Sequence, residues 1–258
     1  MIKFQSFLSG SSGNCTFLTN DSTKILVDCG ATGKYITDCL GRLGISPNTI
    51  DAILVTHEHR DHTSGVGVMS RKFQIPVYAT APTWEGMDAI VGGIREENRK
   101  VVPANEDFAI KDLVIRPFDI PHDANNPVGY SFTDHDHKFT IATDIGHISD
   151  ELLENLRGSE YIIIEANHDI EMLRTGRYPY YLKRRILSDR GHLSNDMCGR
   201  LCAMLAKEGT RAFWLGHLSK ENNVPQLAYD TVNSILKEQK ICVGSDVGLS
   251  VIPRYWLR

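Results

Sequence analysis

Three histidines and an aspartate lie close together in the segment His57-Glu58-His59-Arg60-Asp61-His62. Neutral imidazole is a common ligand of zinc and related metals, and carboxylate is the usual hard partner. The apolar run 51–56 just before it is typical of a buried strand, so these side chains can converge at a strand end. A solvated polar loop is the weaker interpretation. A structural metal is a further alternative, although structural zinc favours four ligands rich in cysteine.

The length, charge and cysteine content indicate what class of protein carries these residues. The chain has 258 residues, 41% of them hydrophobic, and a net charge of -4, which gives no global attraction to nucleic acid or anionic membrane. No apolar run reaches transmembrane length, and the first residues do not resemble a signal peptide. Because no export signal or membrane span is recognised, we expect a cytoplasmic location and no membrane partner. The six cysteines form no C-x-x-C pair and are expected to be reduced thiols. Cys198 and Cys202 are expected in the core of a helix.

Strands and helices are predicted in both halves of the chain. Strands are expected over 2–8, 15–19, 24–29, 51–56, 77–79, 108–110, 113–118, 128–133, 138–142, 161–165 and 211–215. Helices are expected over 33–43, 63–73, 82–90, 149–156, 195–207 and from about 222 to 237. No linker divides the chain, so the sequence predicts a single domain over 1–258, of the α+β class, with sheet packed on sheet and helices outside.

The spacing H-x-H-x-D-H resembles the signature of the metallo-β-lactamase superfamily of hydrolases. Further motifs of that family follow in order along the chain, and they place Asp28, His122, Asp144 and His217 after strands or in a loop. The resemblance implies a four-layer αββα sandwich built from essentially the whole chain.

The resemblance also implies a site for two divalent metal ions, manganese or zinc, with iron as a third candidate. One ion would be held by His57, His59 and His122, the other by Asp61, His62 and His217, and Asp144 would bridge them. Asp28 would orient one of the ligands. A hydroxide bound between the two ions would attack the substrate, and Asp61 would both ligate a metal and orient or deprotonate the attacking water.

A basic segment, residues 174–190, points to the substrate. It holds six basic residues, one acid and three tyrosines, a composition suited to phosphates and stacked bases. A solvated helix face explains it equally well. Five cations in it are predicted to bind substrate: Arg174, Arg177, Lys183, Arg184 and Arg185.

Two short motifs, SGSSGN at 9–14 and HLSKENN at 217–223, resemble the YycJ/WalJ-type subgroup of the superfamily. That resemblance implies a DNA exonuclease acting from 5′ to 3′ in DNA repair, with nucleic acid and repair proteins as partners. One alternative is a small-molecule hydrolase such as a cyclic phosphodiesterase, thioesterase or lactonase. A second is a non-catalytic metal-binding signalling accessory.

The tetrapeptide GHLS occurs twice, around His192 and around His217. His217 follows a strand and is expected to bind metal. His192 precedes a helix that Ser194 or Asn195 would cap. Related phosphodiesterases have a non-ligand histidine there, paired with a glutamate that matches Glu165, so His192 is expected to be a general acid held by Glu165.

Four histidines lie outside this scheme. His135 and His137 copy the metal motif but are expected in an exposed hairpin turn. His147 and His168 follow strands and receive no assigned role.

Overall fold

The structure is a computed structural model, and it describes residues 1–257. The chain forms two units and passes between them more than once. The first unit contains residues 1–119, 124–136 and the C-terminal segment from Arg254; the second contains residues 120–123 and 137–253. The single domain expected over 1–258 stays a prediction.

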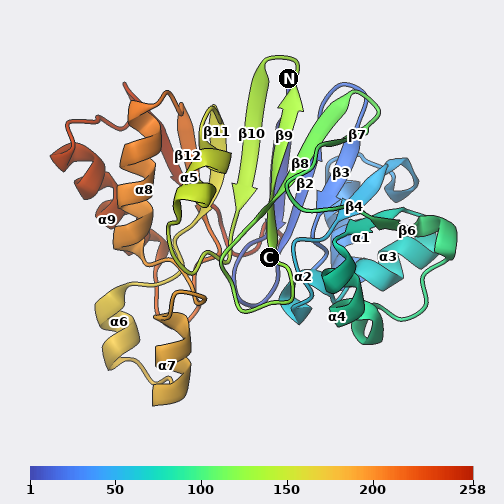
Figure 1. The fold of residues 1–258 in the computed structure, drawn as a ribbon, viewed down its shortest axis with the longest axis horizontal. Coiled ribbons are helices and arrows are strands. Elements are labelled where there is room, and N and C mark those ends of the chain that lie inside the picture. The colour runs from blue at the N-terminus through green and yellow to red at the C-terminus, as the bar shows by residue number, and fades with distance from the viewer. Residues whose placement is uncertain (258) are drawn as a thin grey trace. The chain divides into compact units, whose positions relative to one another are not determined.

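The first unit contains a six-stranded sheet in the order β1-β2-β3-β4-β5-β6 (Figure 1). The six strands are β1 Lys3–Leu8, β2 Cys15–Thr19, β3 Lys24–Val27, β4 Ala52–Leu54, β5 Val77–Ala79 and β6 Arg99–Val101. Strands β1 to β3 pair antiparallel, and β3 to β6 pair parallel. The carboxyl ends of β3 and β4 therefore meet at one edge of the sheet.

Four helices belong to this unit: α1 Gly33–Arg42, α2 Arg60–Thr63, α3 Val66–Phe73 and α4 Ala81–Val91. Two 3-10 turns cover Pro47–Thr49 and Glu96–Asn98. The single helix expected over 63–73 is in fact α2 and α3, separated at Gly65. The Gly65 amide donates to the carbonyl of Cys29 at 2.7 Å, and a Cβ there would lie 2.2 Å from the carbonyl oxygen of Ala31. This packing against the segment after β3 breaks the helix.

Three antiparallel strands complete the first unit: β7 Phe108–Ile110, β8 Leu113–Asp119 and β9 Val128–Asp134. The sequence predicted all three strands. In β8, buried Leu113 and Ile115 alternate with exposed neighbours, the pattern of a strand with one face in the core.

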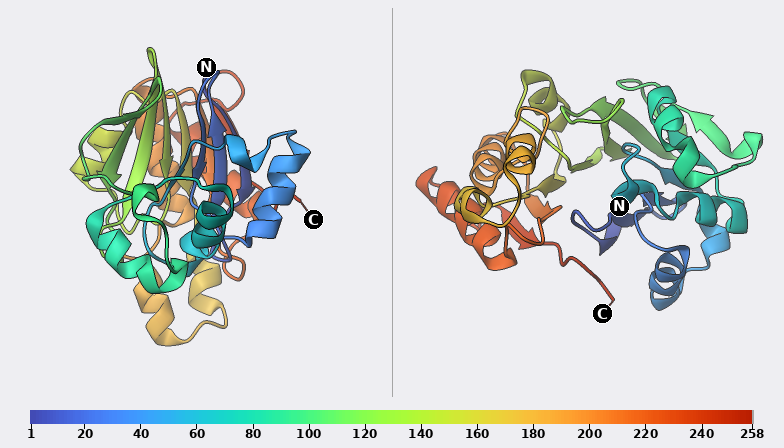
Figure 2. Two further views of the ribbon diagram at one scale, coloured as in Figure 1. Left: turned by 90° about the vertical axis from the view of Figure 1, so that its right-hand side faces the viewer. Right: turned by 90° about the horizontal axis from the view of Figure 1, so that it is seen from below.

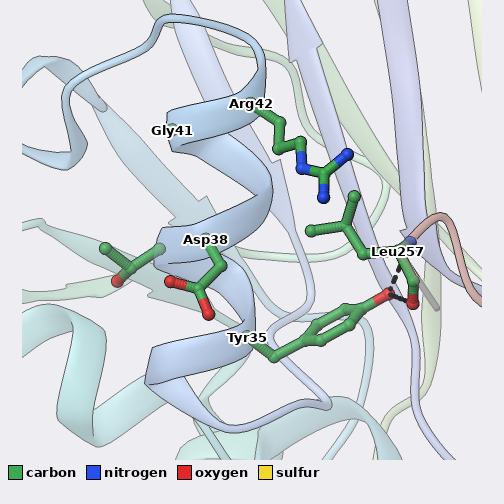
Figure 3. A pocket seen from close by; sticks show the side chains of 6 residues that line it. Tyr35, Asp38, Gly41, Arg42 and Leu257 are labelled. Carbon is green, nitrogen blue, oxygen red and sulfur yellow. Dashed lines mark hydrogen bonds between the residues drawn. The ribbon is translucent and has the colours of Figure 1, made fainter.

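The C-terminal segment returns to the first unit beside β1 and α1. Trp256 stacks on Phe7 with ring centroids 5.6 Å apart. The Tyr35 hydroxyl of α1 donates to the Phe7 carbonyl at 2.9 Å and accepts from the Leu257 amide at 3.3 Å. Figure 3 shows the Tyr35 hydroxyl bonded to Leu257. Both residues, with Arg42, line a hollow of about 740 Å³.

The second unit contains four parallel strands: β10 His137–Ala142, β11 Tyr161–Glu165, β12 Ala212–Gly216 and β13 Gly248–Val251. Its helices are α5 Asp150–Leu156, α6 Ile170–Thr175, α7 Tyr180–Ile186, α8 Asn195–Lys207 and α9 Pro225–Glu238. Figure 1 shows α8 and α9 side by side next to β12, while α6 and α7 extend beyond the carboxyl ends of the strands, as Figure 2 also shows.

Helix α8 begins and packs as its sequence predicts. The Ser194 side chain accepts from the Met197 amide and caps the helix. Cys198 and Cys202 are both fully buried, which confirms that they belong to the core. Gly199 lets α9 approach, because a Cβ there would lie 2.7 Å from Ile235. Over residues 1–257, no helix has the length and apolar character needed to cross a membrane.

Candidate functional site

In the first unit, candidate residues gather where β3 and β4 end. Asp28 follows β3, and Thr56 and His57 come two and three residues after β4. Asp28 has a φ of 56°, a left-handed conformation that is uncommon for residues other than glycine. Such strain persists only where the surroundings impose it, and it concentrates at functional sites.

Asp28 fixes the ring of His62. Its Oδ2 accepts from His62 Nδ1 at 2.7 Å, and its Oδ1 accepts from the Thr56 amide at 2.9 Å. A carboxylate on Nδ1 determines the tautomer and presents Nε2 as the ligand atom. His62 Nε2 lies 3.6 Å from Asp61 Oδ2. Both atoms can therefore contact one cation.

His57 and His59 form a second pair of donor atoms. His57 Nε2 lies 3.0 Å from His59 Nδ1, and His57 Nδ1 lies 3.0 Å from Thr56 Oγ1. Two nitrogens this close suit a shared cation, to which each would bind at about 2.0–2.1 Å if it were zinc. Glu58 does not join them, because its Oε1 accepts from the Asn125 amide at 2.9 Å.

The glycine-rich loop 9–14 contacts Asp61 and His62 through Asn14. The Asn14 amide donates to the Asp61 carbonyl at 2.7 Å, and its side-chain Nδ2 lies 2.9 Å from His62 Nε2. Gly30 allows the close approach, since a Cβ there would lie 1.6 Å from the Asp61 oxygen. The sequence marked this loop by its composition but did not identify Asn14 as a contact of the motif.

In the second unit, three candidates follow neighbouring parallel strands. Asp144 comes after β10, Glu165 ends β11, and His217 comes after β12. Asp144 and His217 also have positive φ, 61° and 55°. Asp144 Oδ1 lies 3.5 Å from His217 Nε2 and 3.8 Å from His122 Nε2. A carboxylate between two imidazoles is placed as a bridging ligand would be.

Glu165 connects this cluster. Its Oε1 accepts from Nδ1 of both His192 at 2.9 Å and His217 at 2.7 Å. Its Oε2 accepts from the amides of Ile145 at 2.7 Å and Leu193 at 2.9 Å. The side chain is fully buried, which alone would raise its pKa. The charges and hydrogen bonds of the two histidines outweigh burial and hold the pKa of Glu165 below its usual range.

The two GHLS histidines thus meet at one carboxylate oxygen. Sequence reasoning paired Glu165 with His192 alone and missed its contact with His217. It also missed Asn167, whose Nδ2 donates to the His217 carbonyl at 3.0 Å and supports its left-handed backbone. Asn167 carries no motif of its own, so only the fold reveals it.

The first GHLS copy also orients His122. His122 Nδ1 donates to the Gly191 carbonyl at 3.0 Å, and its Nε2 lies 3.3 Å from Asp123 Oδ1 and 3.8 Å from Asp144 Oδ1. Burial lowers the pKa of His122, so the ring is kept neutral, the form that binds metal.

Four other histidines, His135, His137, His147 and His168, differ in exposure and in their partners. The His135 side chain is 90% exposed and lies in the turn after β9, and His137, at the start of β10, pairs with Glu160 at 2.8 Å. Neither contacts the clusters described above. His147 donates from Nδ1 to the Asp189 carbonyl at 2.8 Å. His168 is buried, and burial lowers its pKa to about 4.

The basic segment forms α6, α7 and the loops around them. Arg174 pairs with Glu171 at 3.0 Å, and Arg185 binds both oxygens of Asp123. Arg177 and Arg184 are exposed, and neither pairs with a carboxylate within residues 1–257. Tyr180 and Tyr181 of α7 are 77% and 75% exposed, as expected for rings that are not part of a core.

Comparison with known proteins identifies relatives over nearly the whole chain. The family model described as the beta-lactamase superfamily domain matches residues 23–218. The exodeoxyribonuclease YycJ of Bacillus anthracis is 37% identical over 94% of this chain and 92% of its own. The exodeoxyribonuclease WalJ of Streptococcus pneumoniae strain D39 is 39% identical over 95% of this chain and 91% of its own.

Solved structures share the architecture at lower identity. The metallo-beta-lactamase fold protein YhfI from Bacillus subtilis matches with a TM-score of 0.72 at 15% identity, over 98% of this chain and 97% of its own. A diphosphatase from the PhnP family matches with a TM-score of 0.65 at 17% identity, over 97% of this chain and 94% of its own. These likenesses concern the fold, which is the αββα sandwich that the sequence predicted.

Proposed function

This chain belongs to the metallo-β-lactamase superfamily and is a metal-dependent hydrolase, and from that premise we propose that it is an exodeoxyribonuclease. We further propose digestion from 5′ to 3′, a role in DNA repair with repair proteins as partners, and action in the cytoplasm. The support is that two relatives named exodeoxyribonuclease align over 94% and 95% of the chain. The observation that carries the chemistry is the single carboxylate, Glu165, that holds both GHLS histidines.

The proposed metal ligands are the seven that the family resemblance implies: His57, His59, Asp61, His62, His122, Asp144 and His217. The donor chemistry fits at His122 and His217, whose Nδ1 is bonded to an oxygen, so that Nε2 is the ring atom that would bind a metal. His62 Nδ1 is bonded to Asp28 in the same way, but its Nε2 also lies 2.9 Å from Asn14 Nδ2, a contact that a metal would replace. Manganese or zinc suits this mixed set, with iron as a third candidate. When bound, two such ions lower the pKa of a water and neutralise charge on the phosphate.

We assign the proton transfers to two side chains. Asp61 orients the attacking water and accepts its proton; its side chain is 27% exposed, so a water can reach it. His192 donates a proton to the leaving oxygen. Its Nδ1 lies 2.9 Å from Glu165 Oε1, a contact that orients the ring and leaves Nε2 as the atom that transfers the proton.

The basic segment is the proposed contact for the DNA backbone. Arg177 and Arg184 are expected to contribute most, since neither must first leave a carboxylate. Arg174 and Arg185 would exchange exposed ion pairs for phosphate, an exchange of little cost because such pairs stabilise by about 1 kcal/mol or less. Lys183 is bonded to the Arg174 carbonyl at 2.7 Å and would act with it.

An end-labelled oligonucleotide assay with Asp61→Asn tests the proposal. Purified protein is incubated with 5′- or 3′-labelled single- and double-stranded DNA and with RNA, in manganese or in zinc. Asp61→Asn should lose most of its turnover while retaining most of its DNA affinity. Asp136→Asn is the matched control, because Asp136 lies in the exposed stretch that copies the motif.

Three outcomes would contradict parts of the proposal. Wild-type protein that cleaves only cyclic nucleotides, thioesters or lactones would make it a small-molecule hydrolase. Normal nuclease activity in Asp61→Asn would remove Asp61 from the mechanism. Release of label in the order expected for attack from the 3′ end would reverse the polarity.

A further inference from the structure

A cavity of about 270 Å³ lies in the second unit, beside the proposed acid His192. The residues His147, His168, Asp189 and His192 line it, together with apolar residues that include Leu187 and Met197. Its size is near the lower limit, about 300 Å³, of sites that enclose small molecules. The cavity therefore suits one flat group of the size of a nucleobase and is too small for a stacked base pair.

His168 is the unexplained residue of this cavity. It is 1% exposed, and within residues 1–257 neither ring nitrogen has a hydrogen-bond partner. Its backbone is held, since its carbonyl accepts from the Asn195 amide at 2.9 Å. A buried polar group without a partner destabilises the fold, so a ligand that hydrogen-bonds to this ring would be favoured at the cavity. A neutral imidazole has one donor and one acceptor, as the polar edges of nucleobases do.

The start of α8 supplies a second feature that favours a nucleotide. Ser194, the cap of this thirteen-residue helix, lines the cavity. The positive end of the helix dipole stabilises a phosphate beside it. A nucleobase in the cavity and its phosphate near the cap and His192 would match the polarity of the walls.

We propose that this cavity binds the terminal nucleoside of one nucleic-acid strand, the nucleoside that is released, with His168 as the residue that recognises its base. The inference rests on the proposed function, because it uses His192 as the acid. A hydroxide oxygen bonds to phosphorus, the bond from phosphorus to the 3′-oxygen breaks with its electron pair on that oxygen, and the oxygen takes the proton of His192. The group beside His192 is therefore the nucleoside that carries the 3′-oxygen.

A base must leave the helical stack to enter the cavity. Unstacking is less costly at a single-stranded end than at a paired end. Single-stranded and frayed ends are therefore the preferred substrates, and blunt duplex ends are cleaved more slowly.

The test compares a normal oligonucleotide with one whose 5′-terminal nucleotide is abasic. Wild-type kcat/KM should be higher for the normal substrate by about 5- to 150-fold, the loss expected when one base no longer stacks. Met197→Trp, which fills the cavity, should bring this ratio close to one. Met204→Trp is the matched control, because Met204 lies on the same helix two turns later and outside the cavity, and it should keep the wild-type ratio.

His168→Phe separates recognition from a structural role. It keeps a ring of similar shape and removes the two nitrogens, so the melting temperature should stay or rise while the ratio falls. In protein labelled with ¹⁵N-histidine, the His168 ring signals should shift when deoxyadenosine monophosphate is added.

The possible failures can be distinguished. A wild-type ratio near one, with normal cleavage of both oligonucleotides, would overturn the nucleoside cavity and leave the nuclease function intact. No cleavage of either oligonucleotide would refute the proposed function, and this inference with it. A His168→Phe protein that melts at lower temperature and keeps its ratio would show that His168 only supports the fold.

Discussion

Replacing Glu165 with glutamine changes one carboxylate oxygen to an NH₂ group in the side chain that holds both His192 and His217. The carboxylate accepts four hydrogen bonds, two from imidazoles on Oε1 and two from backbone amides on Oε2. Glutamine offers one oxygen and one NH₂ group at the same places. Its NH₂ group must therefore face either the two amides or the two imidazoles, and both arrangements have a cost.

If the NH₂ group faces the amides of Ile145 and Leu193, two buried donors lose their acceptor. Each costs about 1–3 kcal/mol, so the free energy of unfolding falls by about 2–6 kcal/mol. For a chain of this size about 1 kcal/mol lowers the melting temperature by about 2–4 °C, so the expected loss is on the order of 10 °C.

If the NH₂ group faces the imidazoles, both rings can change tautomer and accept from it. His217 Nε2 then carries a proton and cannot bind metal. The loss then falls on metal affinity, by about 10- to 100-fold, as is typical when the partner of a ligand is replaced.

Glu165→Gln should therefore show one of two deficits, separated by two measurements. The melting temperature of metal-free protein reports the first, and a manganese or zinc titration reports the second. Glu160→Gln is the matched control, because Glu160 also accepts from a histidine, His137 at 2.8 Å, but at the surface. That pair should change stability by about 1 kcal/mol or less. A Glu165→Gln protein with wild-type melting temperature and metal affinity would refute the reasoning.

Four further predictions concern these clusters and the basic segment. Burial lowers the pKa of His168 from 6.5 to about 4; the charge of His192 also lowers it, whereas the charges of Glu165 and Asp169 raise it. Between pH 6.5 and 4 the unfolded chain therefore binds one more proton at His168 than the folded chain does. The free energy of unfolding should then fall by a few kcal/mol at most as the pH drops from about 6.5 to 4. Denaturant unfolding at several pH values measures this fall, which should be smaller in His168→Phe. His217→Ala should lose metal by elemental analysis and all activity. His192→Ala should keep both metals, and its turnover on DNA should fall by about 10²–10⁴-fold. It should cleave an aryl phosphodiester, whose leaving group needs no proton, near the wild-type rate. Equal losses of turnover on both substrates would exclude proton donation. Neutralising Arg177 and Arg184 should lower the slope of log affinity against log salt by about one unit each in a filter-binding series, whereas Arg95→Gln, distant in sequence, should leave it unchanged.

The sequence determined much of the local structure, because its signals are local. Strands β8 to β10 and helix α8 were predicted within a residue or two, since alternation along β8 and the cap at Ser194 depend on near neighbours. The dense motif at 57–62 identified metal-binding chemistry for the same reason. The break at Gly65 was not predictable, because it arises from packing on residues 29 and 31.

Only the tertiary structure decided how the distant residues of the second unit are connected. Glu165, His192 and His217 are separated by 27 and 25 residues, yet two hydrogen bonds to one oxygen join them. The parallel strands β11 and β12 bring Glu165 and His217 to one edge of the sheet, and the loop before α8 brings His192 there. The sequence predicted a pair where the fold makes a triad. His168 carried no motif at all, and its importance comes from a burial that leaves both ring nitrogens without a partner within residues 1–257. The residue type determines which hydrogen bonds a side chain can make. Contacts between segments far apart in the chain decide which of its donors and acceptors find a partner.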